Sequence, residues 1–203
     1  PTQKDSQSRQ RKINQTKMNL RSILEIDARL SSQMRVAEKP GFLRNLAIFF
    51  AHSGDSWFWA AALILFWFFS NPEWRQWETV EFFGLSGLAV VVLAVKFLFK
   101  RKRPEGDWGG IYRNTDPHSF PSGHAARAFL IPVLASALAP PWLATLLWVW
   151  APLVALARVA MGVHYLSDII AGAILGVIVA LLGLQFYQFL IDWFAGLTGF
   201  HFW

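Results

Sequence analysis

Cysteine is absent from the 203-residue sequence, which excludes a disulfide framework, a thiolate metal site and a cysteine nucleophile. Charged residues are also scarce: they make up 16% of the chain, against roughly 25% in soluble domains. Hydrophobic residues reach 54%, with 11 Trp and 18 Phe, and they gather in blocks longer than the helices of a soluble core need. The sequence therefore predicts an integral membrane protein of one domain rather than a soluble protein.

The N-terminal stretch is polar and basic. Residues 1–19 lack apolar periodicity, and we expect no cleavable signal peptide there. In residues 20–37, apolar side chains recur near helical spacing between arginines, which is typical of an amphipathic helix. Two positions remain open for this helix: on the membrane surface, or packed on the protein's own loops. Lys39-Pro40-Gly41 ends it, so we expect a basic tail and surface helix over 1–41 and a membrane domain over 42–203.

The rest of the chain predicts an all-α integral membrane helical bundle with five to six membrane segments. Residues 42–51 form an apolar run too short to span, and His52-Ser53-Gly54-Asp55 interrupts it. His52 and Asp55 could be polar groups behind a functional site or only a helix break, and we favour the helix break. One long kinked span over the same region is the alternative. Residues 71–79 read as a polar connector with interfacial tryptophans. The five expected spans cover residues 55–70, 80–99, 121–139, 142–160 and 165–194.

Counting the crossings places three polar stretches at one membrane face. The second and fourth spans end there, and the third and fifth begin there. Residues 96–104, 121–124 and 158–168 should therefore meet, although they are far apart in the sequence. Ionisable groups beside hydrocarbon are expensive, so such a convergence indicates a functional site.

The converging side chains suit a phosphate. Three cations, Lys96, Arg103 and Arg158, outnumber one carboxylate. Ser122 and Gly123 open a helix, whose free N–H groups and positive dipole end bind anions. Taken singly, Lys96 could be a lysine at a helix end reaching the interface, and Ser122-Gly123 could be a simple cap.

Two histidines add the chemistry of phosphoryl transfer. His164 and Asp168 are four apart, so they share a helix face, and the carboxylate can orient the imidazole. His164 would attack phosphorus, while His124 would protonate the leaving oxygen and then activate water. A structural ion pair at a helix end is the alternative for His164 and Asp168. No carboxylate cluster suited to Mg²⁺ stands nearby, so we expect no metal and no cofactor.

Other polar side chains near these stretches receive smaller roles. Lys100, Arg101 and Lys102 are interpreted as contacts to lipid headgroups. Asp116, His118 and Arg127 are expected to line the mouth of the site, and the loop over 105–120 is expected to set headgroup preference.

The motifs resemble those of a known family. Six residues separate Lys96 from Arg103-Pro104, Pro121-Ser122-Gly123-His124 follows, and Arg158 precedes His164 and Asp168 by five and then three intervening residues. This order and spacing is similar to the three signature motifs of the type 2 phosphatidic acid phosphatase superfamily, which also includes vanadium haloperoxidases and glucose-6-phosphatase. One departure is Ala157, where the third motif usually has serine.

The resemblance implies a membrane phosphatase domain over 42–203 and assigns roles within it. His164 would be the nucleophile, Asp168 its partner and His124 the acid. The residues implied to bind the substrate phosphate are Lys96, Arg103, Ser122, Gly123 and Arg158.

An embedded bundle of this kind implies a lipid substrate. We expect a metal-independent phosphatase that acts on a phosphomonoester or pyrophosphate of a membrane lipid, such as phosphatidate, phosphatidylglycerophosphate or polyprenyl pyrophosphate, through a phosphohistidine. A catalytically silent protein that binds or scaffolds lipid phosphates is the alternative.

The expected partners are the substrate and the bilayer, with no nucleic acid. All of the 19 Lys and Arg residues except Arg75 fall on the catalytic side by the crossing count. The positive-inside rule then predicts a protein of the cell (inner) membrane whose site faces the cytoplasm.

Overall fold

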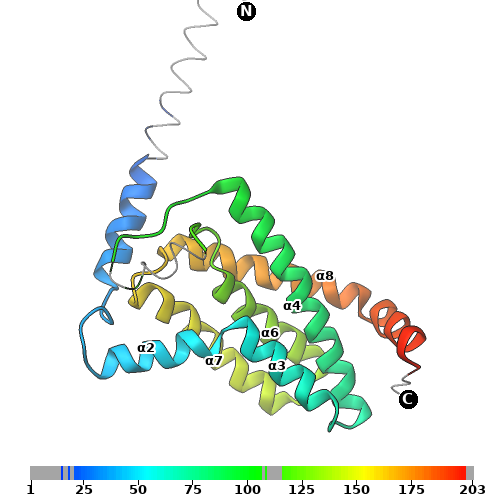
Figure 1. Cartoon of the computed structure of the whole chain (residues 1–203). Helices are drawn as coiled ribbons and strands as arrows, with labels where there is room; N and C mark the ends of the chain where they lie inside the picture. The colour runs from blue at the N-terminus through cyan, green and yellow to red at the C-terminus, as the bar shows by residue number, and fades with distance from the viewer. Residues whose placement is uncertain (1–14, 16–17, 19–20, 107, 109–115, 200–203) are drawn as a thin grey trace, which may run out of the picture.

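The computed structural model describes residues 15, 18, 21–106, 108 and 116–199. Within these ranges the secondary structure is helical apart from an isolated β-bridge, which confirms the all-α expectation (Figure 1). A helix over residues 21–33 precedes the bundle. The bundle consists of α2 (Phe42–Ser53), α3 (Ser56–Trp67), α4 (Pro72–Phe99), α6 (Gly123–Leu138), α7 (Pro141–Ala160) and α8 (Leu166–Thr198).

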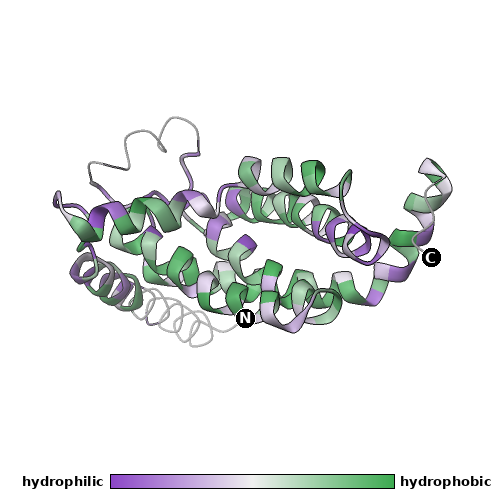
Figure 2. Ribbon diagram, turned by 90° about the horizontal axis from the view of Figure 1, so that it is seen from below, coloured by the Kyte–Doolittle hydropathy of each residue, from purple (hydrophilic) through white to green (hydrophobic). Residues whose placement is uncertain are grey.

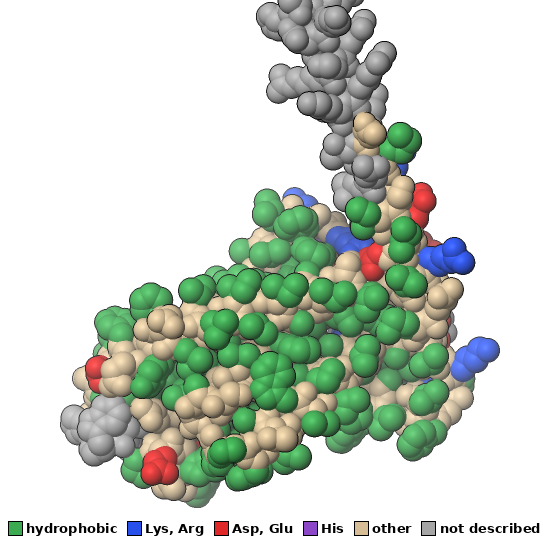
Figure 3. All heavy atoms as spheres, turned by 180° about the vertical axis from the view of Figure 1, so that it is seen from behind, with side chains coloured by type: hydrophobic (Ala, Val, Ile, Leu, Met, Phe, Trp, Pro, Cys, Tyr) green, Lys and Arg blue, Asp and Glu red, His purple; other side chains and the backbone are tan. Residues whose placement is uncertain are grey.

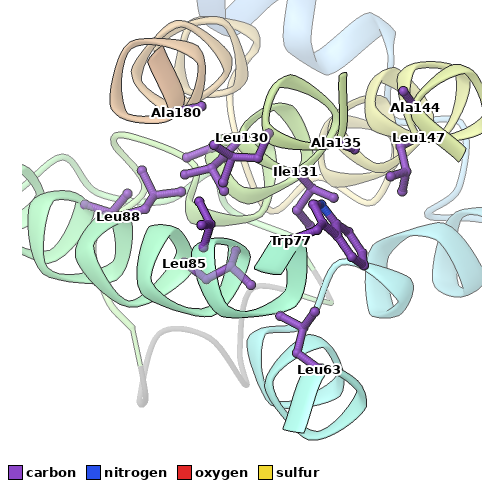
Figure 4. Close-up of a cluster of buried hydrophobic side chains, with 14 of the residues drawn as sticks. Leu63, Trp77, Leu85, Leu88, Leu130, Ile131, Ala135, Ala144, Leu147 and Ala180 are labelled. Atoms are coloured by element: carbon purple, nitrogen blue, oxygen red, sulfur yellow. The ribbon is translucent and has the colours of Figure 1, made fainter. Parts of the chain in front are cut away.

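The main core lies between α4, α6 and α7 (Figure 4). Leu88 of α4 and Leu130 and Ile131 of α6 are almost completely buried there, and Leu147 of α7 closes the cluster. Since lipid tails are as apolar as leucine, close van der Waals packing rather than the hydrophobic effect must hold such helices together. The shape of these side chains therefore matters more than their hydrophobicity.

Two glycines on α8 allow it to touch the backbone of α6. A Cβ added at Gly172 would collide with the Ser122 carbonyl oxygen, and one at Gly176 would collide with the Ala126 carbonyl oxygen. Glycines spaced four apart are a common device for close approach between membrane helices. Because Ser122 begins α6, this contact also fixes the position of the α6 N-terminus.

The helix boundaries in the first half of the chain differ in part from expectation. Residues 71–79 are not a connector: α4 begins at Pro72, and the Asn71 side chain accepts a hydrogen bond from the Trp74 N–H at 3.1 Å. Asparagine is a favoured N-cap and proline is preorganised for the first helical position, so this polar segment starts a helix. Residues 42–67 form two helices, α2 and α3, bent by 54° at the predicted break.

The outer surface of the bundle is apolar. Among the described residues, α4, α7 and α8 are each long and apolar enough to cross a membrane, and α2 and α3 together would count as a fourth span. Large side chains such as Phe66, Leu93 and Leu182 are exposed. Apolar residues dominate the bundle helices in Figure 2, and Figure 3 shows hydrophobic side chains over one whole face with charges at its margins. Such a continuous apolar surface suits a lipid environment.

The N-terminal helix (residues 21–33) packs on the bundle, as one of the two predicted positions requires. Its contact face is polar: Asp27 and Ser31 are buried against the start of α8. Its apolar residues Ile23, Ile26 and Leu30 remain exposed. The periodicity in the sequence thus indicated a helix, but its apolar stripe is not the face that packs on the protein.

The contact between α6 and α8 makes a prediction about stability. Gly176→Ala should lower the midpoint of thermal unfolding in detergent micelles, by an amount equivalent to about 1–3 kcal/mol, because the new methyl group meets backbone that cannot move aside cheaply. Gly183→Ala is the matched control on the same helix, since nothing lies within 4 Å of the position that its new methyl group would take, and it should be neutral or stabilising by up to about 1 kcal/mol. Equal midpoints for the two variants would contradict this account of the packing.

Candidate active site

The three polar stretches lie together at one end of the bundle, where α4 and α7 end and α6 and α8 begin (Figure 1). The Ser122 N–H donates to the Asp168 carbonyl oxygen at 3.0 Å, which joins the starts of α6 and α8. Arg103, in the loop after α4, donates to the Val163 carbonyl oxygen at 2.9 Å. Backbone contacts therefore hold the three stretches in one site.

His164 is buried between a carboxylate and a guanidinium. Its Nδ1 lies 3.4 Å from Oδ2 of Asp168, and its Nε2 lies 3.0 Å from Nη1 of Arg103. Because arginine can only donate hydrogen bonds, Nε2 must accept, and Nδ1 then carries the proton toward Asp168. This tautomer places the lone pair on Nε2, which can act as a nucleophile once Arg103 turns its N–H to a phosphate oxygen.

Burial also keeps this imidazole uncharged. Burial, the largest cause, and the positive charges of Arg103 and Arg158 together lower the pKa of His164 to about 3, although its hydrogen bond to Asp168 opposes them. A histidine with such a pKa is neutral across the physiological range. Arg158 itself is fully buried at the end of α7.

Both oxygens of the Asp168 carboxylate accept hydrogen bonds. Its Oδ2 also accepts from the Tyr165 N–H at 2.9 Å, and its Oδ1 accepts from Nη1 of Arg101 at 2.8 Å. The second amino group of Arg101 donates to Oδ2 of Asp27 at 2.7 Å. Our interpretation of Arg101 as a headgroup contact is therefore wrong: its guanidinium joins two carboxylates inside the protein.

Lys96 and Arg103 converge on a single carboxylate oxygen. Nη2 of Arg103 donates to Oδ2 of Asp116 at 2.8 Å, and Nζ of Lys96 donates to the same oxygen. Although burial alone would raise it, the pKa of Asp116 is lowered by Lys96 and Arg103. Two donors aimed at one anionic oxygen are the arrangement that a phosphate oxygen requires.

His124 has a carboxylate partner in Asp55, for which the sequence had favoured a simple helix break. Its Nε2 donates to Oδ1 of Asp55 at 2.8 Å, and Oδ2 of Asp55 lies 3.0 Å from Nδ1 of His52. The polar residues between α2 and α3 are thus more than a helix break. A carboxylate inside an apolar run was the available signal, the same one that drew attention to Asp168.

The bend between α2 and α3 is built to present Asp55. The Ser53 carbonyl oxygen accepts from Nε1 of Trp59 at 2.9 Å, and its hydroxyl accepts from Nε1 of Trp150 at 2.8 Å. A Cβ at Gly54 would lie 2.7 Å from Cγ1 of Val154, so only glycine fits between the bend and α7. These contacts fix the carboxylate beside α6.

A cavity of ≈ 330 Å³ opens at this place. Four of the predicted site residues line it: Lys96, Gly123, His124 and His164. Asp116 and Arg127 line it as well, as expected, and Leu88, Ala89, Val92 and Leu93 of α4 supply an apolar wall.

The remaining predicted residues surround these. Arg103 and Asp168 contact His164, and the Ser122 hydroxyl accepts from the Ala125 N–H at 3.4 Å, which makes Ser122 the N-cap of α6. Among the residues that the structure describes, no group of three His, Asp or Glu side chains has the geometry to hold a metal ion. Residues 107 and 109–115 of the loop predicted to set headgroup preference lie outside the described residues.

Comparisons with known proteins agree with this geometry. Residues 77–192 match the model of the PAP2 superfamily. The chain is 28% identical to the probable lipid phosphate phosphatase beta of Arabidopsis thaliana, over 82% of this chain and 91% of that protein. It is 30% identical to the decaprenylphosphoryl-5-phosphoribose phosphatase of Mycobacterium tuberculosis, over 75% of this chain and 84% of that protein.

A solved structure shares the fold. The PAP2-type phosphatidylglycerolphosphate phosphatase of Bacillus subtilis superposes with a TM-score of 0.68 at 24% identity, over 82% of this chain and 87% of that one. The family match includes Lys96, Arg103, His124 and His164, the residues gathered around the cavity. This chain is therefore a membrane phosphatase that belongs to the PAP2 superfamily.

Proposed function

We propose that this lipid phosphatase hydrolyses a phosphomonoester or pyrophosphate of a membrane lipid through a phosphohistidine at His164, without a metal ion. One observation carries the proposal. The neutral His164 imidazole, oriented by Asp168, directs its Nε2 lone pair toward Arg103. Arg103 and Lys96 in turn both bind one oxygen of the Asp116 carboxylate. Phosphoryl transfer needs mainly such positioning and charge stabilisation.

The first half of the reaction forms the intermediate. The substrate phosphate takes the position of the Asp116 carboxylate between Lys96 and Arg103, and Arg158 and the α6 N-terminus stabilise the charge on its oxygens. Nε2 of His164 attacks phosphorus as the bond to the leaving oxygen breaks. The positive charge that develops on the imidazole is stabilised through the Nδ1 proton by Asp168.

His124 acts first as the general acid and then as the general base. It donates one to the leaving oxygen in the first half, and in the second half it takes one from the water that attacks the phosphohistidine. Its Nε2 is committed to Asp55, so Nδ1 is the atom that faces the leaving oxygen. The Asp55 carboxylate would stabilise the protonated form of this imidazole, the form that donates to the leaving oxygen.

The apolar wall of the cavity supports a lipid substrate. Leu93 lines the cavity and is also 55% exposed on the outer surface of α4, so the cavity borders the lipid-facing side of the bundle. An acyl or prenyl chain can lie along α4 while its phosphate reaches His164. Phosphatidate, phosphatidylglycerophosphate and polyprenyl pyrophosphate all have this division into an anionic head and an apolar chain.

Removal of the nucleophile tests the mechanism. We expect His164→Ala to reduce phosphate release from each of these lipids by at least about 10³-fold, as for other enzymes that lose a nucleophile. The wild-type rate should persist in EDTA. Substrate labelled with ³²P should leave acid-labile label on the denatured wild-type protein and none on His164→Ala. Turnover near the wild-type level in the variant would refute the phosphohistidine.

The role of Asp55 predicts a dependence on the leaving group. Asp55→Asn should lower kcat for lipid substrates by about 10–100-fold, because His124 is then a poorer acid. The loss should be smaller with p-nitrophenyl phosphate, whose leaving group departs without protonation. Asp192→Asn, an exposed carboxylate on α8, is the matched control and should leave both rates unchanged. An equal loss with both substrates would indicate a structural role for Asp55.

We also propose that the site faces the cytoplasmic side of the cell membrane. By the crossing count, Arg75 is the one Lys or Arg on the far side, and it lies at the opposite end of α4 from Lys96. Basic residues favour the cytoplasmic side. The cysteine-free chain allows clean single-cysteine labelling of intact cells. A membrane-impermeant maleimide should label Glu73→Cys, at the far end, and should label Lys39→Cys only after the cells are opened. Labelling of Lys39→Cys from outside would reverse the orientation.

A further inference from the structure

The N-terminal helix (residues 21–33) caps the first turn of α8. Oδ1 of Asp27 accepts from the Ser167 N–H at 3.0 Å, and the Ser31 hydroxyl accepts from the Leu166 N–H at 2.8 Å. The free N–H groups of a helix start are usually satisfied by a neighbouring residue. Here the acceptors come from 140 and 135 residues earlier in the chain. The first turn of α8, the helix that carries Asp168, is therefore hydrogen-bonded to the N-terminal helix.

The Asp27 carboxylate also binds Arg101. Nη2 of Arg101 donates to Oδ2 of Asp27 at 2.7 Å, while Nη1 donates to Oδ1 of Asp168 at 2.8 Å. Its guanidinium also lies 4.0 Å from the centre of the Tyr165 ring. Asp27 and Asp168 are both buried, at 8% and 0% exposure. A rigid, planar cation thus has each end fixed to a buried carboxylate, a geometry that lysine cannot reproduce.

We propose that Asp27 is a positioning residue of the active site. Through Arg101 it fixes the plane of the Asp168 carboxylate and so the direction of the His164 imidazole. The contact between Nδ1 of His164 and Oδ2 of Asp168 is already long, at 3.4 Å, so a small rotation of the carboxylate would break it. Without Asp27, Nη2 of Arg101 loses its partner and the guanidinium is free to draw the Asp168 carboxylate away.

In this role the N-terminal helix contributes to catalysis through Asp27. This inference rests on the proposed role of His164. It concerns a residue that touches neither the substrate nor the reacting atoms, so its loss should affect kcat and leave KM unchanged. Lys96 and Arg103, by contrast, would bind the phosphate directly, so their loss should raise KM.

The test is Asp27→Asn, which keeps the size of the side chain and removes its charge. We expect kcat per folded enzyme to fall by about 10-fold or more while KM stays within about 2-fold. Inhibition by orthovanadate should weaken by a similar factor, because its five-coordinate adduct requires a correctly directed imidazole. Glu25→Gln, an exposed carboxylate on the same helix, is the matched control and should match the wild type in all three values.

Two further variants separate positioning from folding. Ser31→Ala removes one cap from α8 without touching Arg101, so it should lower the unfolding midpoint with kcat within about 2-fold of the wild type. Arg101→Lys retains the charge but cannot join both carboxylates, so it should reproduce the kcat loss even if Asp27→Asn does not fold.

A fall in the amount of folded Asp27→Asn protein, with normal kcat and normal vanadate inhibition in what remains, would overturn the inference. If the wild-type chain hydrolyses none of the lipid phosphates, the proposed function fails instead. Binding of orthovanadate followed by ⁵¹V NMR would then still decide whether Asp27 acts on the site, since weaker binding by Asp27→Asn supports it and equal binding refutes it.

Discussion

Ionised side chains enclosed by apolar helices need a counter-charge within reach, because an unpaired buried charge costs several kcal/mol. At the end of the bundle that holds the cavity, Arg101 lies between Asp27 and Asp168, and Asp116 lies between Lys96 and Arg103. These pairs come from segments distant in sequence, so satisfying them draws the N-terminal helix, the loop after α4 and the start of α8 together. The charge pairing that makes the site tolerable in a membrane protein therefore also assembles it.

Close helix packing supplies the precision that charge pairing lacks. Gly172 brings α8 against the Ser122 carbonyl oxygen, and the Ser122 N–H is bonded to the Asp168 carbonyl oxygen. The start of α6, which we propose binds the phosphate, and Asp168 are thereby fixed relative to each other by backbone contacts.

The sequence was sufficient for the fold class and for the set of residues that meet, because span counting and motif spacing depend only on local patterns. It was insufficient for Asp55, Arg101 and Asp27, whose roles depend on partners more than sixty residues away. Arg101 sits in a run of basic residues at a helix end, where headgroup contact is the usual role. The start of α4 was misplaced because polar residues preceded the apolar run, although the Asn-Pro pair marks a helix start.

The carboxylates around the two histidines argue for catalysis over simple phosphate binding. A protein that only bound lipid phosphates would need Lys96, Arg103 and the α6 N-terminus, and each nearby carboxylate would weaken its affinity for an anion. Asp168 and Asp55 nevertheless sit beside His164 and His124, directed at their ring nitrogens. Such groups become favourable when an imidazole gains positive charge during the reaction, since stabilisation that appears only then accelerates it. The placement of negative charge in a phosphate site is thus the feature that distinguishes an enzyme from a binder.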